Sequence, residues 1–398
     1  MTAVDVAVAG GGPAGILLGL LLARRGVRVV VLEKHADFLR DFRGDTIHPS
    51  TLEVMDDLGL TDRLLQIDHH KEARMQLGFG GERVTLADFR RLPTRHRYVA
   101  LMPQWDLLEF LSTEAARYPG FELRRQAEVT GLLEEDGAVR GLRYRGTDGE
   151  HEVRATLVVA ADGRHSRVRE AAGLVPVAGA PPMDVLWVRV SRRATDPDAS
   201  VIQIGGGTLL VLIHRTTYWQ LGYVIPKGGD AEVRAAGLDA LRSQVAGVAP
   251  FLGDRMDEIH SWEDVHLLTV ESNRLRRWYR AGLLCIGDAA HAMSPVGGVG
   301  INLAVQDAVA AANLLAEPLR TDRLTERDLA AVQRRRQLPT VATQLVQGLV
   351  QRRMFAPAER GATRSVPWAL RTLPRLPVLR DLPGRLVGLG FRRAHVEG

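Results

Sequence analysis

A glycine-rich turn at residues 10–15 has the residue types and the spacing of a phosphate-binding loop. In the pattern Gly10-x-Gly12-x-x-Gly15, the first glycine permits a tight turn and the second lets a pyrophosphate approach the backbone. The third lets a helix pack closely on a strand. Glu33 stands 18 residues after Gly15, where an acid binds a ribose hydroxyl. The pattern predicts a dinucleotide site, and the acid disfavours a 2′-phosphate.

Two strands and one helix must position this turn. Apolar residues at 4–9 predict a buried strand, residues 16–23 predict a helix, and residues 27–32 predict a second strand. Gly26 is placed to end the helix after Arg24 and Arg25. The helix N-terminus offers unpaired N–H groups and a partial positive charge to phosphates.

Two later segments carry glycine beside aspartate. Residues 161–165 (Ala-Asp-Gly-Arg-His) follow a predicted strand at 153–160, and residues 287–291 (Gly-Asp-Ala-Ala-His) follow a strand at 283–287. The second of these leads into a glycine-rich stretch, residues 295–302, and then a predicted helix at 301–316. Each segment alone is a weak signal, but their order and spacing in one chain are specific.

With these segments in place, the chain resembles the group A flavoprotein monooxygenases, whose best-known fold type is p-hydroxybenzoate hydroxylase. The resemblance covers roughly residues 1–350. It implies an α/β fold in which a Rossmann-like FAD-binding domain is interleaved with a substrate domain built on an antiparallel β-sheet, plus C-terminal helices. We expect the FAD-binding domain at 1–180 and 270–330, the substrate domain at 181–269 and a helical or irregular tail at 331–398.

The resemblance also implies which residues hold FAD. Glu33 would bind the adenosine ribose, Val129 would contact the adenine, and Asp288 would hydrogen-bond the ribityl chain. Arg43 would lie near the pyrophosphate or the isoalloxazine, Gln104 near the ribityl or phosphate region, and Asp162 near FAD and the nicotinamide cofactor. The full expected set is Gly10, Gly12, Pro13, Ala14, Gly15, Glu33, Lys34, Arg43, Gln104, Val129, Asp162, Gly287, Asp288, Pro295, Gly298, Gly300, Ile301 and Asn302.

The stretch at 295–302 has a physical reason to face the flavin ring. Gly300 precedes the helix that starts at Ile301, so N–H groups would face the flavin N1–C2=O edge, where negative charge gathers on reduction. A partly buried helix N-terminus stabilises such a charge by up to about 2 kcal/mol. We name no catalytic residue and no metal ligand from the sequence.

The implied function is a single-component monooxygenase that hydroxylates an aromatic or phenolic small molecule. NAD(P)H would reduce FAD as a transient co-substrate, O₂ would add at flavin C4a, and the resulting hydroperoxide would transfer oxygen to the ring. Three alternatives on the same fold stay open, namely an isoprenoid reductase, a membrane-surface hydroxylase of quinone precursors and a halogenase. Residues 221–226 lack both tryptophans of the halogenase motif. A flavin-binding protein without turnover is a fifth interpretation.

Composition excludes other classes of protein. The 398 residues carry a net charge of +5, mostly from arginine, without the basic and aromatic interleaving of a single-strand binder, so we expect no nucleic-acid partner. Residues 334–336, three arginines, are expected on a solvated helix face. One cysteine excludes internal disulfides and a cysteine zinc site. With no leader or membrane span evident, we expect a cytoplasmic monomer or homodimer.

Several other residues are secondary candidates. Residues 50–53 (Ser-Thr-Leu-Glu) fit a capping box, residues 181–226 predict an antiparallel meander, and residues 231–246 predict one helix. His69 and His70 read as a loop pair without metal-ligand spacing, and His291 as a structural residue. His48 and His165 are open between an active-site role and none, as are the aromatic residues of the meander, which are Trp187, Trp219 and Tyr223.

Overall fold

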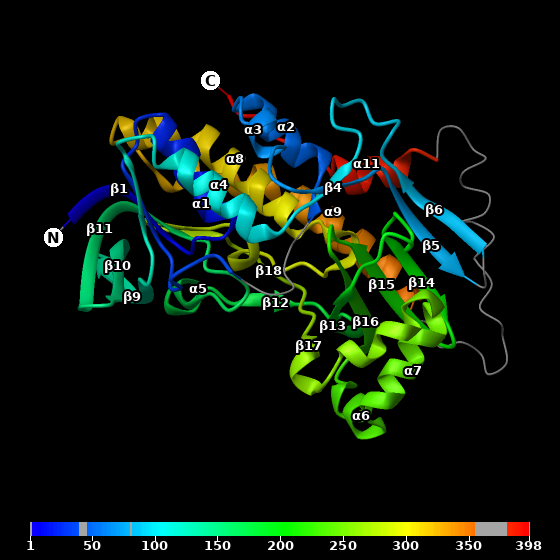
Figure 1. Ribbon diagram of the computed structural model, residues 1–398. Coiled ribbons are helices and arrows are strands. Elements are labelled where there is room, and N and C mark those ends of the chain that lie inside the picture. The colour runs from blue at the N-terminus through cyan, green and yellow to red at the C-terminus, as the bar shows by residue number, and fades with distance from the viewer. Residues whose placement is uncertain (1, 40–45, 80–81, 355–379, 398) are drawn as a thin grey trace.

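The computed structural model describes residues 2–39, 46–79, 82–354 and 380–397. Its larger sheet has eight strands, and its central strands are parallel (Figure 1). Across the sheet the order is β19 (Tyr279–Arg280), β20 (Leu283–Cys285), β11 (Gly149–Ala160), β1 (Thr2–Ala9), β2 (Val29–Leu32) and β8 (Phe121–Arg124), with β10 (Ala138–Gly146) and β9 (Glu128–Glu135) joined through β11.

Four helices lie against this sheet and against one another. They are α1 (Pro13–Arg24), α4 (Gln104–Ala115), α8 (Gly300–Arg320) and α9 (Glu326–Met354). Helix α1 packs on both α4 and α8, which is why all of its residues from 14 to 23 are buried. Gly26, with φ +79°, follows the end of α1 as expected. The main apolar core fills the space between these helices and the sheet.

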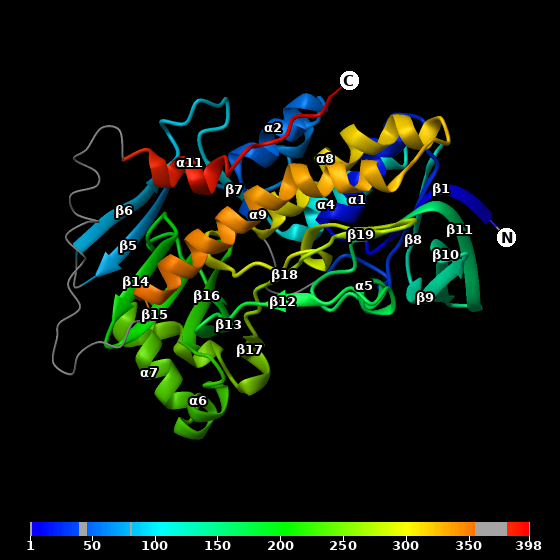
Figure 2. The same cartoon turned by 180° about the vertical axis from the view of Figure 1, so that it is seen from behind.

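One apolar stretch, Val296–Arg320, has the length and composition of a membrane-spanning helix among the described residues. In the protein, 83% of its most apolar window is buried against other elements, as is typical of a core helix. Figure 2 shows α9 beside it, running diagonally from the larger sheet toward the second one.

The second sheet has seven strands, and helices cover one of its faces. The order of the strands is β17 (His266–Leu268), β13 (Met183–Ser191), β16 (Tyr218–Pro226), β15 (Thr208–His214), β14 (Val201–Gly205), β5 (Arg74–Phe79) and β6 (Glu82–Asp88). Helices α6 (Asp230–Ala236) and α7 (Leu238–Val248) lie below it in Figure 1.

The predicted meander is only partly right. β14, β15 and β16 are consecutive neighbours, but β13 pairs with β16 instead of β14, and β14 pairs in parallel with β5. In the sheet, β16 therefore lies between β13 and the two strands β14 and β15. Because β5 and β6 come from residues 74–88, the second sheet draws on both sides of the expected boundary at 180. The division into domains stays a prediction.

Smaller elements connect the two sheets. A three-stranded sheet consists of β3 (Thr46–Ile47), β7 (Val99–Leu101) and β4 (His70–Glu72), and β12 (Pro176–Ala178) pairs with β18 (Asn273–Leu275) where the chain passes between the sheets. The short helices are α2 (Pro49–Asp57), α3 (Thr61–Leu64), α5 (Arg167–Ala171) and α11 (Leu382–Gly388). Of the expected tail, residues 355–379 and 398 lie outside the described part of the chain.

Three local predictions were wrong for identifiable reasons. The capping box at 50–53 does not form, because α2 begins at Pro49 and the Ser50 and Thr51 hydroxyls bond elsewhere. The helix at 231–246 is two helices, since Gly237 adopts φ +92° between them. The arginines at 334–336 are not all solvated, because Arg336 is 1% exposed and forms a buried ion pair.

Candidate functional site

The N-terminal glycine turn has the geometry that a diphosphate needs. Gly10 has φ +101°, and a Cβ there would lie 2.4 Å from the Ala161 carbonyl oxygen; a Cβ at Gly15 would lie 2.0 Å from Gly10 O. At Gly12, in contrast, a Cβ would meet no described atom within 4 Å, so the backbone is open to a ligand. Gly12 is also the N-cap of α1, and none of the described side chains caps it. The turn and the helix N-terminus thus fit a bound pyrophosphate.

Glu33 lies directly under this turn. Its carboxylate accepts hydrogen bonds from the Gly11 N–H at 2.9 Å and the His35 N–H at 3.0 Å, and the residue is 7% exposed. The acid therefore holds the turn in shape as well as standing where a ribose hydroxyl is expected. Neighbouring Lys34 is exposed.

The Asp-Gly turn adjoins the glycine turn. Asp162 follows β11, is half-buried, and accepts hydrogen bonds from the Ser166 hydroxyl and from the Val168 N–H at 3.2 Å. Burial raises the pKa of Asp162, and these hydrogen bonds oppose that shift. Because Gly10 packs against Ala161, the first two segments meet directly.

Two arginines that sequence reasoning missed connect the second segment to the third. Arg169 is 8% exposed and donates to the Ala289 carbonyl at 3.1 Å and to the Arg164 carbonyl at 2.7 Å. Arg164 in turn lies 3.7 Å from the Asp288 carboxylate. Gly287 completes the contact with the first segment, because a Cβ there would lie 3.3 Å from Ala14 Cβ. The structure therefore gathers all three segments at one place.

A buried ion network fixes the Gly-Asp segment to the helices behind it. Asp307 on α8 is fully buried and accepts from the Gly287 N–H at 3.1 Å, from His291 Nε2 at 2.6 Å and from Arg336 Nε at 2.9 Å. Burial alone would raise the pKa of Asp307, but His291 and Arg336 outweigh it and hold that pKa below its ordinary value. His291 therefore has a partner that makes it structural.

The glycine-rich stretch before α8 is held from three sides. Gly297 and Gly298 have φ of +80° and +63°, and the Gly298 carbonyl accepts from Thr46 Oγ1 at 2.9 Å and lies 3.0 Å from His48 Nε2. Burial lowers the pKa of His48 to about 4, so this imidazole is neutral at physiological pH. Gln347 on α9 donates to the Ser294 and Val296 carbonyls at 3.0 and 2.7 Å.

The start of α8 is left open, as a flavin-facing helix N-terminus requires. A Cβ on Gly300 would have no described atom within 4 Å, and the first turn lacks a capping side chain in the part of the chain that is described. Ile301 and Asn302 are buried, and Asn302 Oδ1 accepts from Ser50 Oγ at 2.7 Å and Thr51 Oγ1 at 3.1 Å. These bonds tie α8 to α2.

The other expected residues are more dispersed. Pro13 opens α1, Pro295 precedes the open glycine stretch, Gln104 opens α4, and Val129 is a buried residue of β9. Their contacts with a cofactor stay predictions. Arg43 lies outside the described residues, and His165 is exposed.

One face of the second sheet lies against the glycine-rich stretch. Val185 and Trp187 on β13 form an apolar cluster that also packs against Val296. Trp187 is 8% exposed, and its Nε1 is buried without a hydrogen-bond partner within the described chain. Trp219 belongs to the cluster on the opposite face, so the aromatic candidates separate by sheet face.

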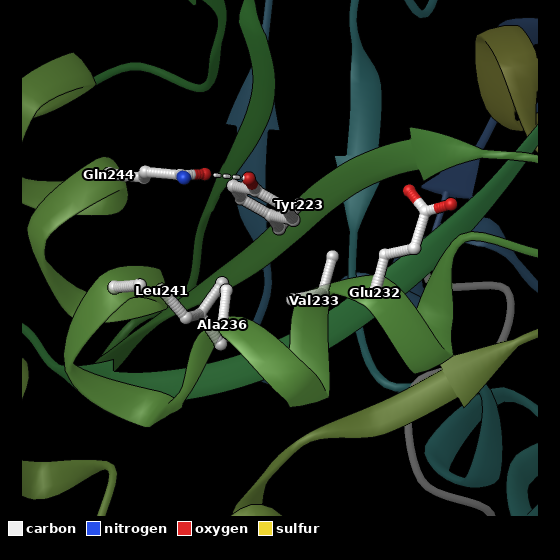
Figure 3. A pocket seen from close by; sticks show the side chains of 7 residues that line it. Tyr223, Glu232, Val233, Ala236, Leu241 and Gln244 are labelled. Carbon is white, nitrogen blue, oxygen red and sulfur yellow. Dashed lines mark hydrogen bonds between the residues drawn. The ribbon is translucent and has the colours of Figure 1, made fainter.

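A cavity of about 180 Å³ lies on that opposite face, under α6 and α7. Figure 3 shows Tyr223 on β16 pointing toward Gln244, to which its hydroxyl is hydrogen-bonded, with Leu241 and Val233 nearby. The sheet separates this cavity from Val296. The cavity is therefore not the place where a substrate ring would meet the glycine-rich stretch.

Comparison with known proteins finds matches over nearly the whole chain. A family model described as an FAD binding domain matches residues 3–347. The 6-methylpretetramide 4-monooxygenase of Streptomyces rimosus is 36% identical over 385 residues, which is 96% of this chain and 91% of that protein. Rifampicin monooxygenase of Streptomyces venezuelae is 33% identical over 324 residues, 76% of this chain but only 62% of the relative.

A solved structure supports the same fold. OxyS anhydrotetracycline hydroxylase from Streptomyces rimosus superposes with a TM-score of 0.77 at 24% identity, covering 98% of this chain and 76% of that one. The predicted fold class and the resemblance drawn from the three segments are confirmed by these matches.

Proposed function

We propose a substrate class for this chain, which belongs to the FAD-binding domain family and is an FAD-dependent monooxygenase of aromatic compounds. FAD is its cofactor, O₂ and a small molecule are its substrates, and NAD(P)H is the reductant usual for the class. The predicted enzyme class, cofactor and reaction type are confirmed. When bound, FAD supplies the electron transfer and the activation of oxygen, and the protein supplies binding and orientation.

The residues proposed to hold FAD are those that the three segments bring together. The open backbone at Gly12 and the uncapped α1 suit the pyrophosphate, and Glu33 suits the ribose. Asp288, beside Arg164, suits the ribityl chain. The open start of α8 at Gly300 suits the flavin ring.

The proposed substrate is a fused-ring phenol. Two relatives act, by name, on 6-methylpretetramide and anhydrotetracycline, which are compounds of this kind. The observation that carries the proposal is the apolar face formed by Val185 and Trp187 against Val296. An apolar face suits a fused ring system, and the Trp187 N–H, which has no hydrogen-bond partner among the described residues, would donate to an oxygen of the phenol.

A kinetic comparison tests this substrate class. Fused-ring phenols should be hydroxylated with a lower KM than single-ring phenols, because more apolar surface is buried. Trp187→Phe should raise KM by up to about tenfold with kcat little changed, since one hydrogen bond of about 0.5–1.5 kcal/mol is lost. Trp262→Phe, on the other face of the sheet, is the matched control.

Two outcomes would count against the proposal. Equal KM values for single-ring and fused-ring phenols would reject the substrate class. An unchanged KM in Trp187→Phe would remove that residue from the pocket. The cytoplasmic location and the choice between monomer and homodimer stay predictions.

A further inference from the structure

Three potential metal ligands that are separated in the sequence meet at the end of β15, an inner strand of the second sheet. His70 opens β4, Asp198 lies in the connection from β13 to β14, and His214 ends β15. One ligand atom from each lies within 4.8 Å of the others. The sequence analysis read His70 as part of a loop pair, because linear spacing gives no sign of the other two residues.

The two histidines are held close, and each has a ring nitrogen without a hydrogen-bond partner within the described residues. Their ring centroids are 3.9 Å apart, and His214 is 4% exposed. These nitrogen atoms are His214 Nδ1 and His70 Nε2, whereas His214 Nε2 lies 3.1 Å from Asp198 Oδ1. A buried polar atom without a partner needs an explanation, and a bound ion is one.

The charges around the cluster are mixed. Asp198 and Glu72 are the acids, and Glu72 Oε2 lies 3.9 Å from His70 Nε2 while accepting from the Ser200 N–H at 2.8 Å. Arg192 opposes a cation, because its guanidinium lies 3.1 Å from Asp198 Oδ1, and Arg215 is a second nearby cation. Arg192 and His214 Nε2 both lie 3.1 Å from the same carboxylate oxygen, Oδ1, and the Asp198 side chain is 80% exposed.

We propose that His70, Asp198 and His214 bind one divalent transition-metal ion of the zinc type, with Glu72 within reach as a fourth ligand. Two imidazoles and a carboxylate are a ligand set that suits Zn²⁺. The ion joins β4, the β13–β14 connection and the end of β15. It therefore links the second sheet to the three-stranded sheet that contains β4.

Zinc titration of the full-length, FAD-loaded, chelator-treated protein tests the proposal. Calorimetry with ZnCl₂ should show one saturable site per chain, accompanied by a rise in the unfolding temperature. His70→Gln and His214→Gln should each weaken Zn²⁺ binding at least about tenfold. Arg192→Gln should tighten Zn²⁺ binding several-fold, because a competing cation is removed. A gain in affinity cannot be explained by destabilisation of the variant.

His151→Gln is the matched control, because His151 pairs with Asp148 at 2.7 Å in an exposed position outside the cluster. It should leave Zn²⁺ affinity unchanged, and the flavin spectrum should report that every variant is folded. Absence of saturable binding to the wild type would overturn the proposal. So would binding that is equally strong in His70→Gln, His214→Gln and the control.

Discussion

The buried ion network around Asp307 makes a quantitative prediction about stability. Asp307→Asn keeps the size of the side chain but removes its charge, which leaves Arg336, 1% exposed, in the interior without a counter-charge. Removing one partner of a buried pair costs about 3–5 kcal/mol. Because Asn retains one acceptor oxygen, we expect a loss near the lower end, about 3 kcal/mol, out of a typical total of about 5–15 kcal/mol.

Urea unfolding at pH 7 measures this loss, and a double variant separates charge from packing. Asp307→Asn with Arg336→Met should recover more than half of the stability, since a buried pair replaced by apolar groups is often close to neutral. The FAD affinity of Asp307→Asn should also fall, because Asp307 holds the Gly287 N–H. A single variant within about 0.5 kcal/mol of wild type, or a double variant no more stable than the single one, would refute the reasoning.

The same variant has a defined pH dependence. The folded-state pKa of Asp307 is lowered, so its stabilising contribution is present above the unfolded value of about 3.9 and is lost as the pH falls through the folded value. The stability difference between wild type and Asp307→Asn should therefore shrink as the pH falls below about 4. A difference that grows on acidification would contradict the lowered pKa.

Four further variants test the residues proposed to hold FAD and the glycine stretch beside them. Glu33→Arg should weaken FAD strongly in a fluorescence titration, and unchanged affinity would reject the ribose assignment. Asp288→Ala should purify folded but colourless, whereas full yellow occupancy would contradict the ribityl assignment. Gly298→Ala should destabilise the apoprotein, because φ is +63° and the new Cβ would lie 2.4 Å from Thr46 Oγ1. Gly300→Ala should leave apoprotein stability intact and lower FAD affinity, and equal behaviour of the two glycine variants would count against the open helix start.

The sequence could predict those parts of the fold that depend on local chemistry. The spacing of apolar residues and the nearby turn residues were enough to predict the glycine turn, the strands before and after α1, and the glycine that follows the end of that helix. The order of the three segments then indicated the family, and with it the larger sheet. Strand pairing was less accessible, because the neighbours of β13 and β14 depend on contacts across long stretches of chain.

The missed site residues share one physical cause. Asp307 and Arg336 lie on different helices. Nothing in the sequence around Asp307, in its alanine-rich helix, or around Arg336, one of three consecutive arginines, indicates that the two residues form a pair. Arg169 likewise acts through carbonyl oxygens distant in sequence. The capping-box pattern at 50–53 was misleading, since Asn302, brought in by α8, offers a competing acceptor.

The most direct test of the central claim is the mass of the product formed under isotopically labelled O₂. The purified yellow protein would be given NADH or NADPH and a fused-ring phenol, with peroxide measured alongside. The account predicts a product that carries one labelled oxygen atom, with reductant consumed in step with product and little peroxide. Bound flavin whose electrons all pass to peroxide, or a product without the label, for every phenol tried would contradict it.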